Sequence, residues 1–455
     1  MSPISAWPRR CHRGWRAALS VGLLSSTMVG QSRAPVGAPQ DSVPAPVMRD
    51  AAFIDVRVLT MKPGELLEHQ TVLVRDGVVM AIGPSDRILV PPHALRISGG
   101  GRAVLMPGLV DTHVHLEAEE RTWIGRFLAA GVTTVFNLRG EARHLALRTA
   151  IRNGQVAGPR IYTSGSYVNL PMVQSAEDAV RAVQEQKSAG YDMLKIHGNV
   201  APLAYDALGT ESARLRIPLI GHAPRNLPFD SVLTHPQVMV AHAEELIYTH
   251  FRENRDTTGI APLARRMVAS GTWLTATLTC YHAIARQIGH PSVVDSALAD
   301  GASRWMPAGL RTIWGSGVYT RRDPATAPSY ESAFTFQQQL VRGLARGGVP
   351  LLAGTDTPLP LIVPGASLLD ELQEFVDAGL TPEQALATAT VNPGRFIRQH
   401  VDSTDRSGVV EIGARADFVL VSQDPRATLS TLRQPLGVMT GGRWYDRRLL
   451  RRLSP

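Results

Sequence analysis

The segment 106–115, MPGLVDTHVH, combines a Pro-Gly turn, an apolar strand and two histidines at the end of that strand. Side chains two positions apart in a strand point to the same face of a sheet. His113 and His115 therefore share one face, where two imidazoles can bind one metal ion. A His-x-His pattern is a weak signal alone, but its place at the end of a buried strand strengthens it.

Seven similar apolar runs follow this segment, each ending in polar residues and separated from the next by a helical stretch. Glycine precedes several runs, as at Gly131, Gly190, Gly271 and Gly348, which is typical of a helix C-cap that leads into a strand. Alternating β and α units predict a parallel sheet. Eight such units over about 250 residues predict a (β/α)₈ barrel at 107–407, with its active site at the carboxyl ends of the strands. The eight runs are 105–115, 132–137, 160–164, 193–197, 218–222, 238–242, 272–277 and 350–356.

Both ends of the chain have a β-rich pattern. Segments 53–60, 71–75 and 78–82 alternate or are rich in β-branched residues, and Asp76-Gly77 is a hairpin signal. Segments 409–412, 416–421 and 436–439 repeat this character, followed by a Gly-Gly turn. Two terminal β regions, 51–106 and 408–446, therefore flank the predicted barrel.

The interval between the seventh and eighth runs is longer than one helix requires. It contains an insertion at 281–347 that carries several Trp, Tyr and Arg residues. Such an insertion is either a lid that sets specificity or a group of peripheral helices, and the sequence leaves both open.

The first 30 residues have the pattern of a signal peptide. They contain four arginines, no acidic residue and an apolar run at 17–30, which serine and threonine interrupt and which is too short to span a bilayer. Residues 31–50 are rich in Pro, Ser, Gln and Ala and predict a flexible linker. We therefore expect export to a periplasm or secretion, with no permanent membrane anchor.

The composition excludes several other classes. The formal charge of +8 arises from 47 basic and 39 acidic residues, and no basic stripe lies inside the sequence, so nucleic-acid binding is not expected. Cys280 is the only cysteine after residue 30, which excludes an intramolecular disulfide and a cysteine zinc cluster from the mature chain. Any metal site must use histidines, carboxylates or a less common ligand.

Lys195 lies on the fourth predicted strand, where Leu194 and Ile196 would face the helices and Lys195 and His197 would point inward. Only three of the 47 basic residues are lysines. A lysine on a barrel strand of such a chain indicates a need for a primary amine, which loses its proton readily when buried and can react with carbon dioxide. A salt-bridged interior lysine is the alternative.

Three more strands end in candidate ligands: His222 ends the fifth run, His242 the sixth and Asp356 the eighth. Each residue alone is more often structural than catalytic. We find no structural explanation for four histidines, a lysine and an aspartate at the ends of strands one, four, five, six and eight.

With these residues the chain resembles the amidohydrolase superfamily, and within it the imidazolonepropionase-like and metal-dependent dipeptidase branch, which is prolidase-like. The similarity extends over about residues 52–445. It rests on PGLVDTHVH at 107–115, Lys195, Gly221-His222, His242, GTD at 354–356, NPG at 392–394 and GARAD at 413–417. The resemblance implies that the terminal β regions form one composite β-sandwich domain beside an α/β barrel.

The resemblance also implies a binuclear zinc site. His113, His115 and Asp356 would hold the more buried ion, His222 and His242 the more exposed ion, and a carboxylated Lys195 would bridge both. Two divalent ions would lower the pKa of a water molecule and polarise the scissile carbonyl. Asp356 would be the catalytic residue that takes the proton of this water and passes it to the leaving amine.

The implied activity is hydrolysis of a C–N amide bond in a small molecule, such as a dipeptide, an N-acyl amino acid or a related carboxamide. Two other enzymes remain open: an imidazolonepropionase-like cyclic amidohydrolase or deaminase with one metal, and a lactonase or phosphotriesterase-like esterase. The deaminase pattern has Glu three residues after the histidine of strand five, where this chain has Arg225. A non-enzymatic relative that keeps the fold for assembly fits poorly with six retained ligands. Homo-oligomerisation stays open.

Four residues are candidate substrate contacts: His197, Tyr167, Arg225 and Tyr248. Arginine binds carboxylates through two parallel hydrogen bonds, so Arg225 and the arginines of the 281–347 insertion are candidates for a substrate carboxylate. His197 is equally consistent with a packed core histidine. Glu244 and Glu245, which follow His242, are expected to support the site or to lie at the surface rather than to act as acid or base.

Overall fold

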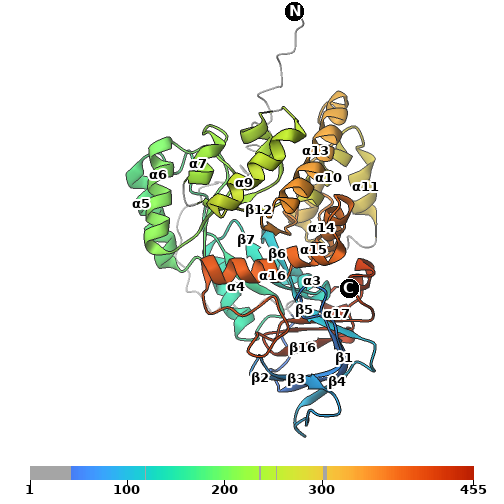
Figure 1. Cartoon of the computed structure of the whole chain (residues 1–455). Helices are drawn as coiled ribbons and strands as arrows, with labels where there is room; N and C mark the ends of the chain where they lie inside the picture. The colour runs from blue at the N-terminus through green and yellow to red at the C-terminus, as the bar shows by residue number, and fades with distance from the viewer. Residues whose placement is uncertain (1–42, 118, 235–236, 253, 301–304, 455) are drawn as a thin grey trace, which may run out of the picture.

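The computed structural model of the chain describes residues 43–117, 119–234, 237–252, 254–300 and 305–454 (Figure 1). The expected signal peptide and residues 31–42 of the expected linker lie outside these ranges. Within the described ranges, no helix is both long enough and apolar enough to cross a membrane.

One sheet joins the two ends of the chain. Its strand order is β16 (Arg443–Asp446), β15 (Gly437–Thr440), β14 (Phe418–Val421), β5 (Val104–Pro107), β1 (Ala51–Val58), β2 (Leu67–Arg75) and β3 (Val78–Pro84), and β4 (Leu95–Ser98) pairs with β1. β14 pairs antiparallel with β5, with Phe418 opposite Pro107. Phe53 meets Phe418 and Trp444 edge to face, with ring centroids 5.9 and 5.3 Å apart. Aromatic side chains from both ends of the chain therefore share one apolar cluster.

The run 105–115 contains two strands, although the sequence predicts one. β5 belongs to the terminal sheet, and β6 (Leu109–Val114) belongs to the parallel strands at the centre of the chain. Gly108 separates them: its N–H donates to the Asp417 carbonyl at 2.8 Å, and a Cβ here would lie 2.2 Å from Thr133 Oγ1. The chain therefore changes sheets at a residue that must be glycine.

The expectation of a strand at 409–412 is wrong. This segment contains bends and the start of a turn, with no strand hydrogen bonding. Gly408 and Gly413, on either side of it, have φ angles of 88° and 84°, which turn the backbone out of the extended conformation. Short apolar runs between such glycines do not distinguish a strand from a packed loop.

Within the described residues, eight parallel strands form the centre of the chain, as the alternating pattern predicts. They are β6, β7 (Val132–Asn137), β8 (Arg160–Thr163), β9 (Leu194–Ile196), β10 (Leu219–Gly221), β11 (Gln237–Ala241), β12 (Trp273–Thr275) and β13 (Leu351–Leu352). The first three and the last five form two sheets. Isolated parallel bridges, Ser164 with Met193 and Val114 with Thr357, join the ends of these two sheets.

Helices fill the intervals between the parallel strands and cover their outer side (Figure 1). They include α2 (Glu120–Trp123), α3 (Gly125–Ala129), α4 (Ala142–Arg152), α5 (Ala176–Ala189), α6 (Pro202–Leu215), α7 (Phe229–Thr234), α8 (Glu244–Leu246) and α9 (Ile260–Ser270). After the last parallel strand come α14 (Ala366–Asp377), α15 (Pro382–Thr388) and α16 (Val391–Phe396), and α17 (Arg447–Leu453) follows β16 of the terminal sheet. Gly190 and Gly271 end α5 and α9 with φ angles of 87° and 71°, as the glycine pattern predicts. Leu194 and Ile196 of β9 share one apolar cluster with residues of α5 and α6, which confirms that they face the helices.

The insertion is helical in its described part. It consists of α10 (Leu278–Gln287), which starts just before it, α11 (Ser292–Ala299), α12 (Ala308–Gly315) and α13 (Ala327–Arg346). α10 packs against both α13 and α14. The insertion is thus a group of helices rather than a long open loop, although some of its residues reach the cavity described below.

Candidate active site

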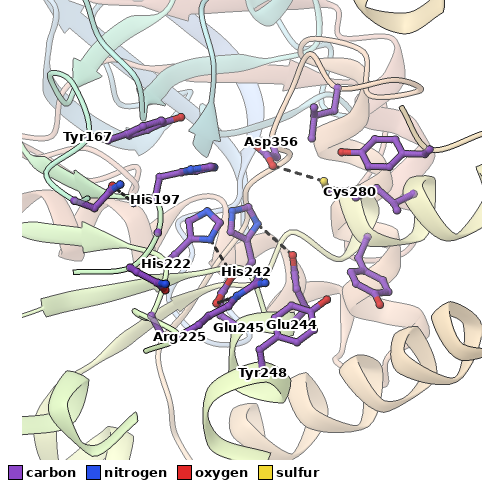
Figure 2. Close-up of a pocket in the computed structure, with 18 of the residues that line it drawn as sticks. Tyr167, His197, His222, Arg225, His242, Glu244, Glu245, Tyr248, Cys280 and Asp356 are labelled. Carbon is purple, nitrogen blue, oxygen red and sulfur yellow. Dashed lines mark hydrogen bonds and ion pairs between the residues drawn. The ribbon is translucent and has the colours of Figure 1, made fainter. Parts of the chain in front are cut away.

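The carboxyl ends of the parallel strands bring the six predicted metal ligands together. His113 lies in β6 and His115 just beyond it, Lys195 is the central residue of β9, and His222, His242 and Asp356 follow β10, β11 and β13. Figure 2 shows His222, His242 and Asp356 pointing into one cavity. This is the edge of the strands at which the alternating pattern predicts an active site.

Asp356 contacts two of the other predicted ligands through one oxygen. Its Oδ1 lies 2.9 Å from His115 Nε2 and 3.2 Å from His113 Nε2. Its Oδ2 faces the other way, 3.7 Å from the Sγ of Cys280 (Figure 2). Burial alone would raise the pKa of Asp356, but the hydrogen bond from His115 and the charges of nearby groups lower it overall. Asp356 is therefore an anion at neutral pH, as a metal ligand must be.

Lys195 is fully buried, and its Nζ lies 3.5 Å from His113 Nε2. Burial lowers its pKa to about 7, so much of the amine is neutral near physiological pH. No ion pair among the described residues includes Lys195, which argues against the salt-bridged alternative. Gly221, with a φ of 123°, makes space for this side chain, because a Cβ there would lie 2.9 Å from Lys195 Cδ.

His222 and His242 are each oriented through Nδ1. His222 Nδ1 lies 2.9 Å from Glu245 Oε1, and His242 Nδ1 lies 2.8 Å from Thr277 Oγ1. These contacts leave the Nε2 atoms available as ligands, in the arrangement common for metal-binding histidines. Burial, followed by neighbouring positive groups, lowers the pKa of both residues well below the usual value, so both imidazoles are neutral.

The backbone turns sharply where these side chains leave the strands. His242, Thr277 and Asp356 have φ angles of 75°, 51° and 59°, in the left-handed region that residues other than glycine rarely adopt. Such conformations cost free energy and persist where the surrounding structure enforces them. Three of them after β11, β12 and β13 indicate that the fold is strained where it directs His242 and Asp356 into the cavity and places Thr277 against His242.

The donor set fits a divalent metal. His113, His242 and Asp356 offer one ligand atom each, all within 4.8 Å of one another. Nδ1 of His113 is buried and has no hydrogen-bond partner among the described residues. Burial is also the main cause of a strongly lowered His113 pKa. Neutral imidazoles beside a carboxylate form the nitrogen and oxygen ligand set that zinc prefers.

One wall of the cavity consists of Tyr167 and His197. Their rings stack 4.5 Å apart at an interplanar angle of 12°, and the His197 ring also meets His222 at 4.6 Å. Asn169 Oδ1 accepts a hydrogen bond from the His197 backbone N–H at 2.8 Å. Burial lowers the pKa of His197 to about 3, so it is a neutral ring. His197 is thus a packed ring that also lines the cavity, and its contact with a substrate stays a prediction.

Arg225 also lines the cavity, and it is bound within the protein. Its Nη2 and Nε donate to Glu245 at 2.6 and 3.1 Å, and its guanidinium lies 4.0 Å from the ring centroid of Tyr248. Glu245 is fully buried and also contacts His222. The sequence prediction that Glu245 supports the site is consistent with this geometry, whereas Arg225 already has a carboxylate partner.

Replacing Glu245 with glutamine is expected to destabilise the protein by about 3 kcal/mol, because the partly buried Arg225 would lose its counter-charge. Metal affinity is expected to fall about 10- to 100-fold, since His222 would lose the carboxylate that orients it. Thermal unfolding and metal titration measure the two effects.

Glu244→Gln is the matched control for Glu245→Gln. Glu244 lines the same cavity, and its Oε1 lies 3.9 Å from His242 Nδ1, which is too far for a hydrogen bond. Burial raises its pKa to about 8, and its Oε2 has no partner among the described residues. A neutral amide there should change stability little. Equal losses in the two variants would contradict the orienting role of Glu245.

The cavity has a volume of about 790 Å³, and the sequence did not identify several residues that line it. They are Cys280, Tyr281, Tyr319, Tyr330 and Asn169, and the cavity is also lined by Glu244 and by Arg322, one of the insertion arginines that the sequence did single out. Most come from α10 and the insertion, whose aromatic and arginine content was the only available signal.

A buried carboxylate places α10 beside the cavity. Glu371 of α14 accepts hydrogen bonds from the backbone N–H groups of Leu278 and Thr279, at 3.1 and 2.7 Å. These are the first residues of α10, where unpaired N–H groups need acceptors. Glu371 therefore holds the end of α10 from which Cys280 and Tyr281 reach the site.

A sequence profile described as Amidohydrolase family matches residues 104–445 of the chain. No curated protein matches the chain in sequence.

Several solved structures are similar in fold. A bottromycin amidohydrolase is 24% identical, with a TM-score of 0.70, and the match covers 89% of each chain. A Xaa-Pro dipeptidase with methionine bound in its active site is 17% identical, with a TM-score of 0.64, over 87% of this chain and 100% of that one. An A. niger ochratoxinase is 17% identical, with a TM-score of 0.64, over 88% of this chain and 96% of that one.

Proposed function

The chain belongs to the amidohydrolase family, and on this premise we propose that it is a metal-dependent hydrolase that cleaves the C–N bond of a small amide. The substrates we propose are dipeptides, N-acyl amino acids or related carboxamides. The observation that carries the proposal is the buried cluster in which Asp356 contacts His113 and His115, with Lys195 and His242 beside it. The names of similar structures, among them a dipeptidase and an amidohydrolase, support the reaction class.

We propose two divalent ions, most simply zinc, as cofactors. His113, His115 and Asp356 would hold one, His222 and His242 the other, with Lys195 between them as a carboxylated ligand. A neutral amine combines with carbon dioxide to form an N–C bond and releases one proton, and the lowered pKa of Lys195 makes its neutral form accessible. Bound ions would lower the pKa of a water molecule and polarise the scissile carbonyl.

Other side chains of the site would transfer protons, orient a metal ligand and contact the substrate. Asp356 would accept the proton of the attacking water and transfer it to the leaving amine. The Glu245 carboxylate keeps His222 oriented and neutralises Arg225. The stacked Tyr167 and His197 rings form an apolar wall against which one end of a substrate would pack.

A one-metal deaminase is less well supported by the residues of the site. Arg225 stands where the deaminase pattern has an acid, and it is bound to Glu245. Amide and ester substrates of the same acyl group separate an amidohydrolase from a lactonase-like enzyme.

We also propose the finer architecture and location. The two bridges between the parallel sheets support one closed (β/α)₈ barrel. The sheet that contains β1, β5 and β14 supports a composite sandwich domain built from both chain ends. Export to a periplasm remains a proposal that rests on residues 1–30.

Metal content per purified chain tests the proposal without a known substrate. We expect about two zinc or similar ions per chain by elemental analysis. About one ion would favour a mononuclear relative, and none after supplementation with zinc would contradict the proposal. A panel of dipeptides and N-acyl amino acids then tests amide hydrolysis.

A further inference from the structure

The cavity contains two arginines that differ in their partners. Arg225 donates two hydrogen bonds to the buried Glu245, at 2.6 and 3.1 Å, so its charge is compensated inside the protein. A guanidinium that already binds a carboxylate in this way has few donors left for a substrate carboxylate.

Arg322, from the insertion, lines the same cavity without such a partner. It donates to the hydroxyl of Tyr330, and its guanidinium lies 5.1 Å from the ring centroid of Tyr319 and 5.5 Å from that of Tyr330. Aromatic faces attract a cation but carry no counter-charge. No ion pair within the described part of the chain includes Arg322, so an anionic ligand would supply the missing partner.

A series of contacts connects Arg322 to the reacting centre. Asp356 Oδ2 contacts Cys280, and the next residue, Tyr281, stacks on Tyr330 with centroids 5.9 Å apart and an interplanar angle of 28°. Tyr330 in turn accepts the hydrogen bond from Arg322. Arg322 therefore lies on the side of Asp356 toward which Oδ2 points.

The orientation of the Asp356 carboxylate indicates on which side of the site each end of a substrate would lie. Asp356 Oδ1 is occupied by His113 and His115, so Oδ2 is the oxygen that can pass a proton to a leaving amine. The amine side of the scissile bond would then face α10 and the insertion. In an N-acyl amino acid or a dipeptide, the α-carboxylate is one carbon away from that nitrogen.

We propose that Arg322 binds the α-carboxylate of the amine-side residue, and that Tyr281, Tyr319 and Tyr330 surround the apolar or aromatic side chain of that residue. The inference rests on the proposed function and narrows it to amides that release an amino acid with a free carboxylate. The planar guanidinium fork matches a carboxylate, whereas a lysine would supply only a point charge.

The test compares two amides that differ only in the carboxylate, N-acetyl-L-phenylalanine and N-acetylphenethylamine. The wild-type metal-loaded protein is expected to favour the acid by about 100-fold in kcat/KM. Arg322→Gln should lower kcat/KM for the acid about 100-fold, mainly through KM, and leave the neutral amide within about twofold. Arg322→Lys should be intermediate. Arg321→Gln is the matched control, because Arg321 is adjacent to Arg322 in the sequence and its side chain is exposed.

Equal losses on both amides in Arg322→Gln would show a structural role and overturn the inference, as would an unchanged preference for the acid. Calorimetric binding of the same two compounds separates this inference from the proposed function. Binding that needs both the carboxylate and Arg322, without hydrolysis, would support the inference and contradict the amidase assignment. Hydrolysis that does not depend on Arg322 would support the amidase assignment and contradict the inference. Neither binding nor hydrolysis would contradict both.

Discussion

Asp356→Asn is expected to lower kcat by about 10³-fold or more while the protein remains folded. The amide keeps the size of the carboxylate but cannot accept a proton from water or deliver one to a leaving amine. It also weakens the ligand that His113 and His115 contact at 3.2 and 2.9 Å. Steady-state kinetics, metal analysis and circular dichroism on the same preparation separate these effects.

Cys280→Ala is the matched control for Asp356→Asn. It removes the thiol that contacts the opposite oxygen of the same carboxylate, at 3.7 Å, and leaves the carboxylate intact. We expect this variant to retain most of its activity. A fully active Asp356→Asn protein would contradict the proposed proton transfer.

Lys195→Ala is expected to remove at least one metal ion per chain and to lower kcat by about 10³-fold, because a bridging ligand would be lost. Lys195→Met keeps an unbranched side chain of similar length, so it tests the amine without leaving a large cavity. Both variants should behave alike in metal content. Lys187→Ala is the control, since Lys187 is exposed and donates to a backbone carbonyl of Arg216.

The same lysine predicts a pH dependence of metal reconstitution. Burial lowers the pKa of Lys195 to about 7, so the neutral amine increases as pH rises through this value. Carbon dioxide reacts with the neutral form, and reconstitution with zinc and bicarbonate should therefore be more complete at about pH 8 than at about pH 6. Wild-type metal content and activity in Lys195→Met would overturn the bridging role.

Several parts of the site could be predicted from local sequence. The five candidate ligands lie within or directly after parallel strands, and the two-residue period of a strand fixes which side chains point inward: they are His113, His115, Lys195, His222 and His242. The same period assigns Leu194 and Ile196 to the helix side of β9, where the structure has them. Patterns of this kind need no knowledge of distant residues.

Other parts depended on contacts between distant segments. Glu245 and Arg225 are 20 residues apart, and nothing in their local sequence shows that they share hydrogen bonds. Glu371 holds the start of α10 from another helix, more than 90 residues away. The expected strand at 409–412 was wrong because glycine φ angles decide the backbone there.

Local sequence was thus sufficient for the β/α order, the two terminal β regions and the identity of the ligand candidates, because periodicity and turn chemistry act over a few residues. The partner of each charged group was decided only when strands and helices packed. Packing paired Arg225 with Glu245 and left Arg322 among tyrosine rings in the same cavity. Local sequence does not distinguish these two arginines, but they differ in whether a carboxylate compensates their charge. The free energy of a buried charge depends on the groups that surround it.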